Sequence, residues 1–238
     1  MDSGFYSVLL LFITLINFSA QAGIVVSGTR VIYPADKKEV TVSMKNTGQT
    51  PALVKSWIDT GDPTEAPQNI TVPFVLMPPF ARIDGGKGQT LRLMYTGGAL
   101  PKDRESVFWL NILSVPPKKT DPHNQYLNVA YQTRIKLFYR PEKLTGQAEM
   151  AARKMKWKIE RGALHIHNPT PYYISILNAK WLPVNDYNTF PGGMVAPFGH
   201  LKLESENLIK QGEVKRLIFN VINDQGMVLD FNLSVDDA

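Results

Sequence analysis

The chain has 238 residues, of which 44% are hydrophobic and 20% charged, with a formal net charge of +5 and no cysteine. This length suits one large β-domain or two ordinary domains, and the apolar fraction supports packed cores, which excludes an intrinsically disordered protein. Without cysteine a disulfide scaffold is excluded, so an exported form must be held together by its hydrophobic cores.

The first 22 residues differ from the rest and predict a secretory signal peptide. Residues 8–16 are apolar apart from Thr14, and Ala20 and Ala22 place small side chains at the two positions that a signal peptidase reads. We expect cleavage before Gly23. The alternatives are a buried first strand or a short membrane anchor.

From Gly23 the chain consists of short β-branched or alternating segments that are separated by Gly, Pro and Asn. The expected strands of this first block are residues 23–32, 39–45, 52–58, 72–76, 81–83, 89–95, 107–115 and 126–139. Strands of this length, regularly spaced and broken by turn residues, predict an antiparallel sandwich or barrel.

A second block of strands follows a connector. Residues 142–152 carry Ala and Lys without a strand pattern and predict a connector or a helical turn. The expected strands of the second block are residues 155–160, 164–168, 175–181, 200–203, 214–221 and 228–235. The sequence therefore predicts an all-β protein with two β-sandwich domains, residues 23–142 and 153–238, joined by a linker over residues 143–152.

The segment from Tyr126 to Tyr139 is longer than an ordinary strand. Leu127, Val129 and Tyr131 fall on one of its faces, because side chains alternate along a strand. By periodicity alone, a central strand with a core-facing apolar side is the better interpretation. The alternative is an edge strand that pairs with another chain, where main-chain hydrogen bonds supply affinity and alternate side chains supply specificity.

Three motifs favour the edge strand. They are Thr29–Pro34 (TRVIYP), Asp103–Asn111 (DRESVFWLN) and Arg134–Pro141 (RIKLFYRP), and Asn223–Gly226 (NDQG) is a weaker fourth. In this order and spacing they resemble the signatures of periplasmic pilus (fimbrial) assembly chaperones, the PapD-like family, over essentially the whole chain from Gly23. The resemblance implies two immunoglobulin-like β-sandwich domains in an L or boomerang arrangement. It also implies a non-enzymatic periplasmic chaperone that binds pilus subunits by donor-strand complementation and delivers them to an outer-membrane usher.

The same resemblance implies roles for five residues around this strand. Arg30 and Lys136 would lie in the cleft between the domains and bind the C-terminal carboxylate of a subunit, since both donate charge-assisted hydrogen bonds. Leu127, Val129 and Tyr131 would enter the groove of a subunit that lacks one strand. Tyr131 stands where the family more often carries an aliphatic residue.

Lys136 has the opposite parity to the three donor residues, so one flat strand cannot point all four side chains the same way. We therefore expect a bulge, a bend or a different approach by the lysine. The resemblance also assigns Glu105, Arg140 and Asp224 to an ion-pair cluster that orients the two domains, since an arginine can bridge two carboxylates. The short segment 116–125 is similar to the loop of the short-loop subgroup.

Other functions find less support in the sequence. His165 and His167 share a strand face, but without cysteine they indicate an exposed pair rather than a metal site. No catalytic constellation stands out, so we expect no enzyme, cofactor, small-molecule substrate or nucleic-acid partner. The main alternative is a secreted two-domain immunoglobulin-like adhesion or structural protein without chaperone activity. The sequence does not decide between a free protein that is monomeric and one that self-associates.

Overall fold

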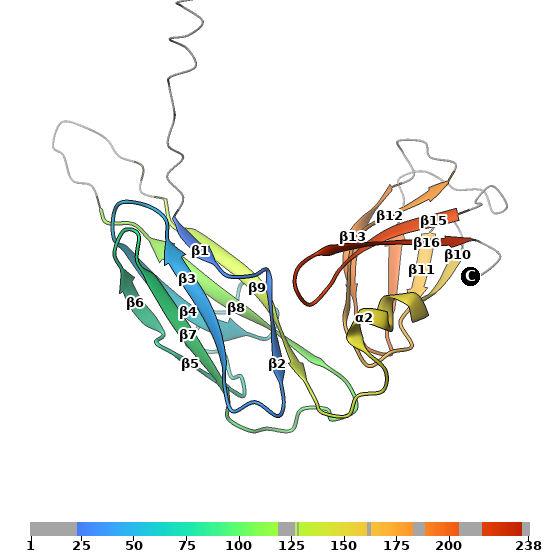
Figure 1. Cartoon of the computed structure of the whole chain (residues 1–238), viewed down its shortest axis with the longest axis horizontal. Helices are drawn as coiled ribbons and strands as arrows, with labels where there is room; N and C mark the ends of the chain where they lie inside the picture. Colours follow the sequence, from blue (N-terminus) through green and yellow to red (C-terminus); the bar gives the residue numbers. More distant parts are fainter. Residues whose placement is uncertain are drawn as a thin grey trace, which may run out of the picture.

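The computed structural model describes residues 23–118, 127, 129–160, 163–182, 189–204 and 216–234, so the predicted signal peptide lies outside the described residues. Almost every described element is a strand, and the strands form two β-sandwiches that meet at an angle and give a boomerang outline (Figure 1). The predicted all-β fold of two immunoglobulin-like sandwiches is confirmed. Among the described residues, no helix is long and apolar enough to span a membrane.

The first sandwich packs a four-stranded sheet, in the order β1-β3-β7-β5, on a five-stranded sheet, in the order β2-β9-β8-β4-β6. Their bounds are β1 (Ile24–Val26), β2 (Arg30–Pro34), β3 (Val40–Asn46), β4 (Ala52–Asp59), β5 (Phe74–Met77), β6 (Phe80–Ile83), β7 (Gly88–Tyr95), β8 (Ser106–Val115) and β9 (Tyr131–Arg140). Alternate side chains of each strand point between the sheets, where Leu91, Leu110 and Leu137 are completely buried.

The second sandwich packs a three-stranded sheet, in the order β10-β11-β14, on a four-stranded sheet, in the order β13-β12-β15-β16. Their bounds are β10 (Lys156–Glu160), β11 (Ala163–His167), β12 (Ile174–Leu182), β13 (Thr189–Val195), β14 (His200–Glu204), β15 (Arg216–Ile222) and β16 (Val228–Ser234). Trp157, Trp181 and Phe219 lie in its core.

The helical turn expected between the blocks is present as α2 (Ala148–Ala151) and the 3-10 turn η1 (Ala152–Lys154). Ala151 and Ala152 are buried in the core of the second sandwich. The end of the predicted linker therefore packs with the second sandwich.

Strand β9 begins at Tyr131, so the prediction of a strand from Tyr126 is corrected. Its partner β8 pairs with it only as far as Ser114, opposite Tyr131. Pro116 and Pro117 follow in β8's direction, and proline has no N–H to continue the ladder. Leu127 and Val129 precede the strand, while Tyr126 and residues 119–125 of the predicted short loop lie outside the described residues.

One edge of β9 is half occupied. Strand β2 runs parallel to β9 and pairs with it from Lys136, opposite Arg30, to Arg140. Before Arg30 the chain crosses to the other sheet, where β1 pairs with β3. Within the described part of the chain, residues 131–135 therefore have β8 on one side and no strand on the other.

One of the two histidines of β11 pairs with a histidine of the neighbouring strand. His167 lies opposite His200 of β14, and the two rings stack with their centroids 4.4 Å apart. No group of three or more metal-ligating side chains occurs among the described residues. Burial, the neighbouring His200 and the charge of Lys156 lower the pKa of His167.

We expect this histidine pair to make the second sandwich less stable in mild acid. Because the pKa of His167 is lower in the folded state, the unfolded chain binds the proton more tightly, and stability falls as the pH drops through about 6.5. Thermal unfolding at about pH 7.5 and about pH 5.5 should show a small decrease in Tm in acid that His200→Gln reduces. An equal decrease in both proteins would contradict this expectation.

Candidate functional site

Arg30 and Lys136 lie side by side where the two sandwiches meet. They are opposite each other in the parallel pairing of β2 with β9. Arg30 Nη1 donates a 2.9 Å hydrogen bond to the carbonyl oxygen of Ile222, and Lys136 Nζ donates a 3.3 Å hydrogen bond to Ser175 Oγ. Both acceptors belong to the second sandwich. A pocket at this boundary is lined from both sides, among others by Arg30, Phe138, Arg140, Tyr173, Ile222 and Asp224.

These two cations have unused hydrogen-bonding capacity. Neither forms an ion pair with a carboxylate of the described residues, and Arg30 Nε is buried without a hydrogen-bond partner there. Burial lowers the pKa of Arg30, which the charge of Asp224 partly offsets, and burial together with the charge of Arg30 lowers the pKa of Lys136. Two half-buried cations that repel each other and keep free donors form a site for an anion, above all a carboxylate.

Arg140, the last residue of β9, bridges the two sandwiches. Its Nε donates to Glu105 Oε1 at 2.6 Å, while Nη1 and Nη2 donate to the two carboxylate oxygens of Asp224 at 2.7 and 3.0 Å. Glu105 is buried, and its Oε2 accepts a 2.7 Å hydrogen bond from the backbone N–H of Tyr173 in the second sandwich. The structure thus brings together the three charged residues that the motifs indicate.

The charges of this cluster depend on one another. Burial alone would lower the pKa of Arg140, but hydrogen bonds and charge from Asp224 and Glu105 outweigh it and raise that pKa. Burial raises the pKa of Glu105, and the Arg140 guanidinium and the Tyr173 N–H partly offset this effect. A buried carboxylate of this kind is tolerated only while its arginine partner is present.

Sequence reasoning missed two apolar or steric contacts between the sandwiches. The rings of Phe138 and Tyr173 lie with their centroids 5.7 Å apart. Gly226 has φ +84°, and a Cβ there would come 2.6 Å from Thr29 Oγ1. Gly226 belongs to the weak fourth motif, and the contact gives a physical reason for glycine at that position.

The three expected donor residues are all exposed, with 90% of Leu127, 39% of Val129 and 68% of Tyr131 accessible to solvent. Ile135 and Leu137, which have the same parity, face the core of the first sandwich. Tyr131 therefore continues the inward-facing side of β9 beyond the end of the core.

No bulge separates Tyr131 from Lys136 in the described ladder. The pairing of β9 with β8 is regular from Tyr139 to Tyr131. Lys136 therefore lies on the outer face of the sheet, opposite to the side of Tyr131, so that between these two residues the lysine approaches the domain boundary from the other face.

Comparison with known proteins agrees with this geometry. Residues 23–145 match the family model of the pili and flagellar-assembly chaperone PapD N-terminal domain, and residues 150–232 match that of the pili assembly chaperone PapD C-terminal domain. The chain is 42% identical over 233 residues to the "Probable fimbrial chaperone YadV" of Escherichia coli (strain K12), covering 94% of this chain and 95% of the relative. It is 42% identical over 226 residues to the chaperone protein FimB/FhaD of Bordetella pertussis, covering 92% and 91%.

Solved structures show the same similarity. The crystal structure of the YadV chaperone aligns with a TM-score of 0.75 at 42% identity and covers 90% of this chain and 100% of its own. The Salmonella enterica SafB chaperone, solved in complex with the SafA pilin, aligns with a TM-score of 0.74 at 27% identity, covering 90% and 96%. Both family models together span nearly all of the chain after residue 22, and so the chain belongs to the PapD-like family of pilus-assembly chaperones.

Proposed function

We propose that this chain binds pilus subunits by strand addition at the open edge of β9, with the C-terminal carboxylate of the subunit held by Arg30 and Lys136. One observation carries the proposal. The open edge stops where β2 begins, and at that junction stand two half-buried cations without a carboxylate partner among the described residues.

The junction favours the end of a chain over its middle. A strand added beside residues 131–135 runs into β2 at Arg30, because β2 already pairs with β9 from Lys136 onward. A chain that terminates there places its carboxylate next to both cations, and it then runs parallel to β9. Charge-assisted hydrogen bonds in a half-buried site are about twice as strong as neutral ones, and so they fix the position of the terminus.

The apolar residues at the other end of the edge supply the second part of the interaction. Leu127, Val129 and Tyr131 are exposed in the free chain. In a subunit groove that lacks one strand, each buried side chain contributes about 1.5–3 kcal/mol. Membership of a chaperone family, and a solved relative in complex with a pilin, support a pilus subunit as the partner. Delivery to an outer-membrane usher and location in the periplasm are part of the same proposal.

A further part of the proposal concerns the domains. We take residues 23–142 and 153–238 as the two domains, and Arg140 with Glu105 and Asp224 as the contact that sets their angle. This angle places Ile222 and Ser175 beside Arg30 and Lys136. An adhesion or structural protein of the same fold is not favoured, because it has no use for two cations without carboxylate partners at the end of an open edge.

A pull-down from periplasm tests the proposal. Tagged chaperone should co-purify with a pilus subunit whose C-terminus is intact, and Val129→Asp should reduce the yield at least about tenfold, because a charge would enter an apolar groove. Val75→Asp is the matched control, since Val75 is similarly exposed (42%) but lies on β5 in the other sheet. Equal yields from the two variants would contradict strand addition.

A further inference from the structure

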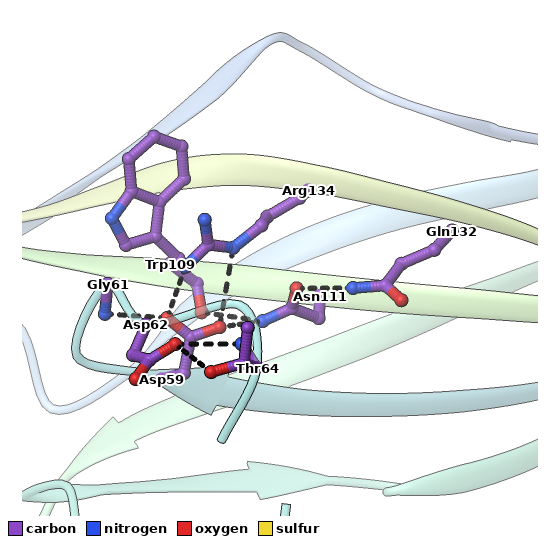
Figure 2. Close-up of polar contacts among 8 residues, drawn as sticks. All are labelled: Asp59, Gly61, Asp62, Thr64, Trp109, Asn111, Gln132 and Arg134. Carbon is purple, nitrogen blue, oxygen red and sulfur yellow. Dashed lines mark hydrogen bonds and ion pairs between the residues drawn. The ribbon is translucent and has the colours of Figure 1, made fainter. Parts of the chain in front are cut away.

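A buried aspartate organises the outer face of the five-stranded sheet next to the anion site. Asp59, at the end of β4, is only 2% exposed. Its Oδ1 accepts hydrogen bonds from Arg134 Nη2 at 2.6 Å and from the Gly61 backbone N–H at 2.7 Å, and its Oδ2 accepts one from Asn111 Nδ2 at 2.6 Å. Figure 2 shows these contacts converging on the carboxylate.

Arg134 is therefore paired with a carboxylate and stacked on an aromatic ring. Its guanidinium lies 4.3 Å from the centre of the Trp109 ring, and its side chain is 21% exposed. Asn111, which also holds Asp59, accepts a 2.9 Å hydrogen bond from Gln132 Nε2. Arg134 and Gln132 thus both extend from the outer face of β9 over β8, Arg134 toward Asp59 and Gln132 toward Asn111 (Figure 2).

Arg134 and Lys136 place two cations on the same face of β9. The two residues are two apart on β9, so they share a face and lie about 6–7 Å apart along the strand. Asp59, Trp109 and Lys136 lie in one row across β4, β8 and β9, with the indole between the aspartate and the lysine. Asp59 forms an ion pair with Arg134, and the charge of Asp62 acts on Arg134 as well, while Lys136 has no carboxylate partner among the described residues.

Two kinds of slip threaten the register of a strand added to β9. A slip by one residue turns every side chain of the added strand to the wrong face, so the alternation of apolar residues opposes it. A slip by two residues keeps every side chain on its own face, so alternation does not oppose it. A carboxylate displaced by two residues from Lys136 would meet Arg134.

We propose that Asp59 is a register-determining residue, which neutralises Arg134 so that a subunit terminus is recognised only at Arg30 and Lys136. Asp59 does not touch the subunit and acts through Arg134, so it is a positioning residue. The inference rests on the proposed function, since it requires the carboxylate to dock at Arg30 and Lys136.

The test uses the pilus subunit that co-purifies with the chaperone, prepared with its natural C-terminus and shortened by one or by two residues. When the donor residues of the chaperone occupy the subunit groove in the native register, a subunit shortened by two residues ends two positions earlier along β9. Its carboxylate then lies beside Arg134 and not beside Lys136. The wild-type chaperone should bind it at least about 30-fold more weakly than the natural subunit, equivalent to about 2 kcal/mol.

Freeing Arg134 should restore this binding. Asp59→Asn removes the charge but keeps the shape, and it should bind the subunit shortened by two residues at least about tenfold more tightly than the wild type does. Asp59→Asn should not bind the subunit shortened by one residue more tightly than the wild type does. The carboxylate of that subunit lies beside a β9 residue whose side chain points to the face opposite Arg134. Asp59→Ser is the second variant, because a hydroxyl can still accept the Gly61 hydrogen bond.

The double variant Asp59→Asn, Arg134→Gln is the matched control. It keeps amide groups at both positions but has no cation there, so it should bind the subunit shortened by two residues as weakly as the wild type does. Recovery in the double variant would show that Arg134 is not its source, and would overturn the proposal. So would weaker binding than the wild type, since Arg134 would then already be available in the wild type.

Thermal unfolding of each variant checks that it is folded. If folded Asp59→Asn and Asp59→Ser chaperones both fail to recover the shortened subunit, the proposal is wrong. The underlying function has a separate test with the natural subunit, because it fails if Lys136→Ala leaves binding of that subunit intact, whatever the Asp59 variants do.

Discussion

Replacing Lys136 by alanine is expected to weaken binding of a pilus subunit by roughly 30- to 1,000-fold, equivalent to about 2–4 kcal/mol. The change removes an ammonium group that is half buried, that donates a hydrogen bond to the hydroxyl of Ser175 and that lies 5.7 Å from the centre of the Trp109 ring, with no carboxylate partner among the described residues. In the complex, the subunit carboxylate would stay desolvated and lose one of its two cations. Arg30→Ala should have an effect of the same size.

Calorimetry or surface-immobilised binding with a purified subunit measures this loss. Lys45→Ala is the matched control, because Lys45 is an exposed lysine of the same sandwich on the far sheet and should leave binding unchanged. Since Arg30 and Lys136 would share one carboxylate, the double variant should lose less than the sum of the single losses. An undiminished complex in either single variant would exclude carboxylate anchoring at this site.

Replacing Arg140 by alanine is expected to lower the free energy of unfolding by about 3–5 kcal/mol. The change leaves the Glu105 carboxylate buried without its arginine, and Asp224 loses both of its hydrogen bonds to the guanidinium. Arg140→Lys should recover only part of the loss, because an ammonium group cannot bridge two carboxylates as the guanidinium fork does.

Urea unfolding measures this loss, and small-angle scattering measures the angle between the sandwiches. Arg92→Ala is the matched control, since it removes the exposed ion pair with Glu39, in which the side chains are 59% and 37% accessible, and exposed pairs contribute at most about 1 kcal/mol. If both variants lose the same stability and keep the same scattering curve, the cluster does not hold the domains.

Much of the fold follows from local pattern. Alternation and turn residues predict the strands around Leu91 and Leu110 because an immunoglobulin-like sandwich buries every second side chain. The predicted start of β9 was too early because the alternation of apolar residues continues back through Leu127 and Val129. A strand also requires a hydrogen-bonded partner, and the partner strand β8 leads into two prolines. Ladder partners are a property of the whole sheet, which a single segment does not reveal.

In the candidate site, too, the sequence reveals some residues and hides the contacts that depend on the whole fold. Arg30, Lys136 and Arg140 stand in motifs, so a family resemblance identifies them, and the structure adds their neighbours. Asp59 was missed because a lone aspartate at the end of a strand resembles any turn residue, and its burial depends on Arg134, which is distant in sequence. A pairing between residues 75 positions apart has no local signal.

The open edge of β9 is also a partly prepared binding surface. Residues 131–135 are already ordered by β8, and Gln132 and Arg134 are fastened on the outer face, so a guest strand meets them without a further loss of backbone entropy. Residues 127, 129 and 130 have no ladder partner in the described part of the chain, and fixing the backbone of each on binding costs about 1–2 kcal/mol. Association should therefore begin at the cations and advance in the manner of a zipper toward Leu127, so that the last contact made is also the first one broken.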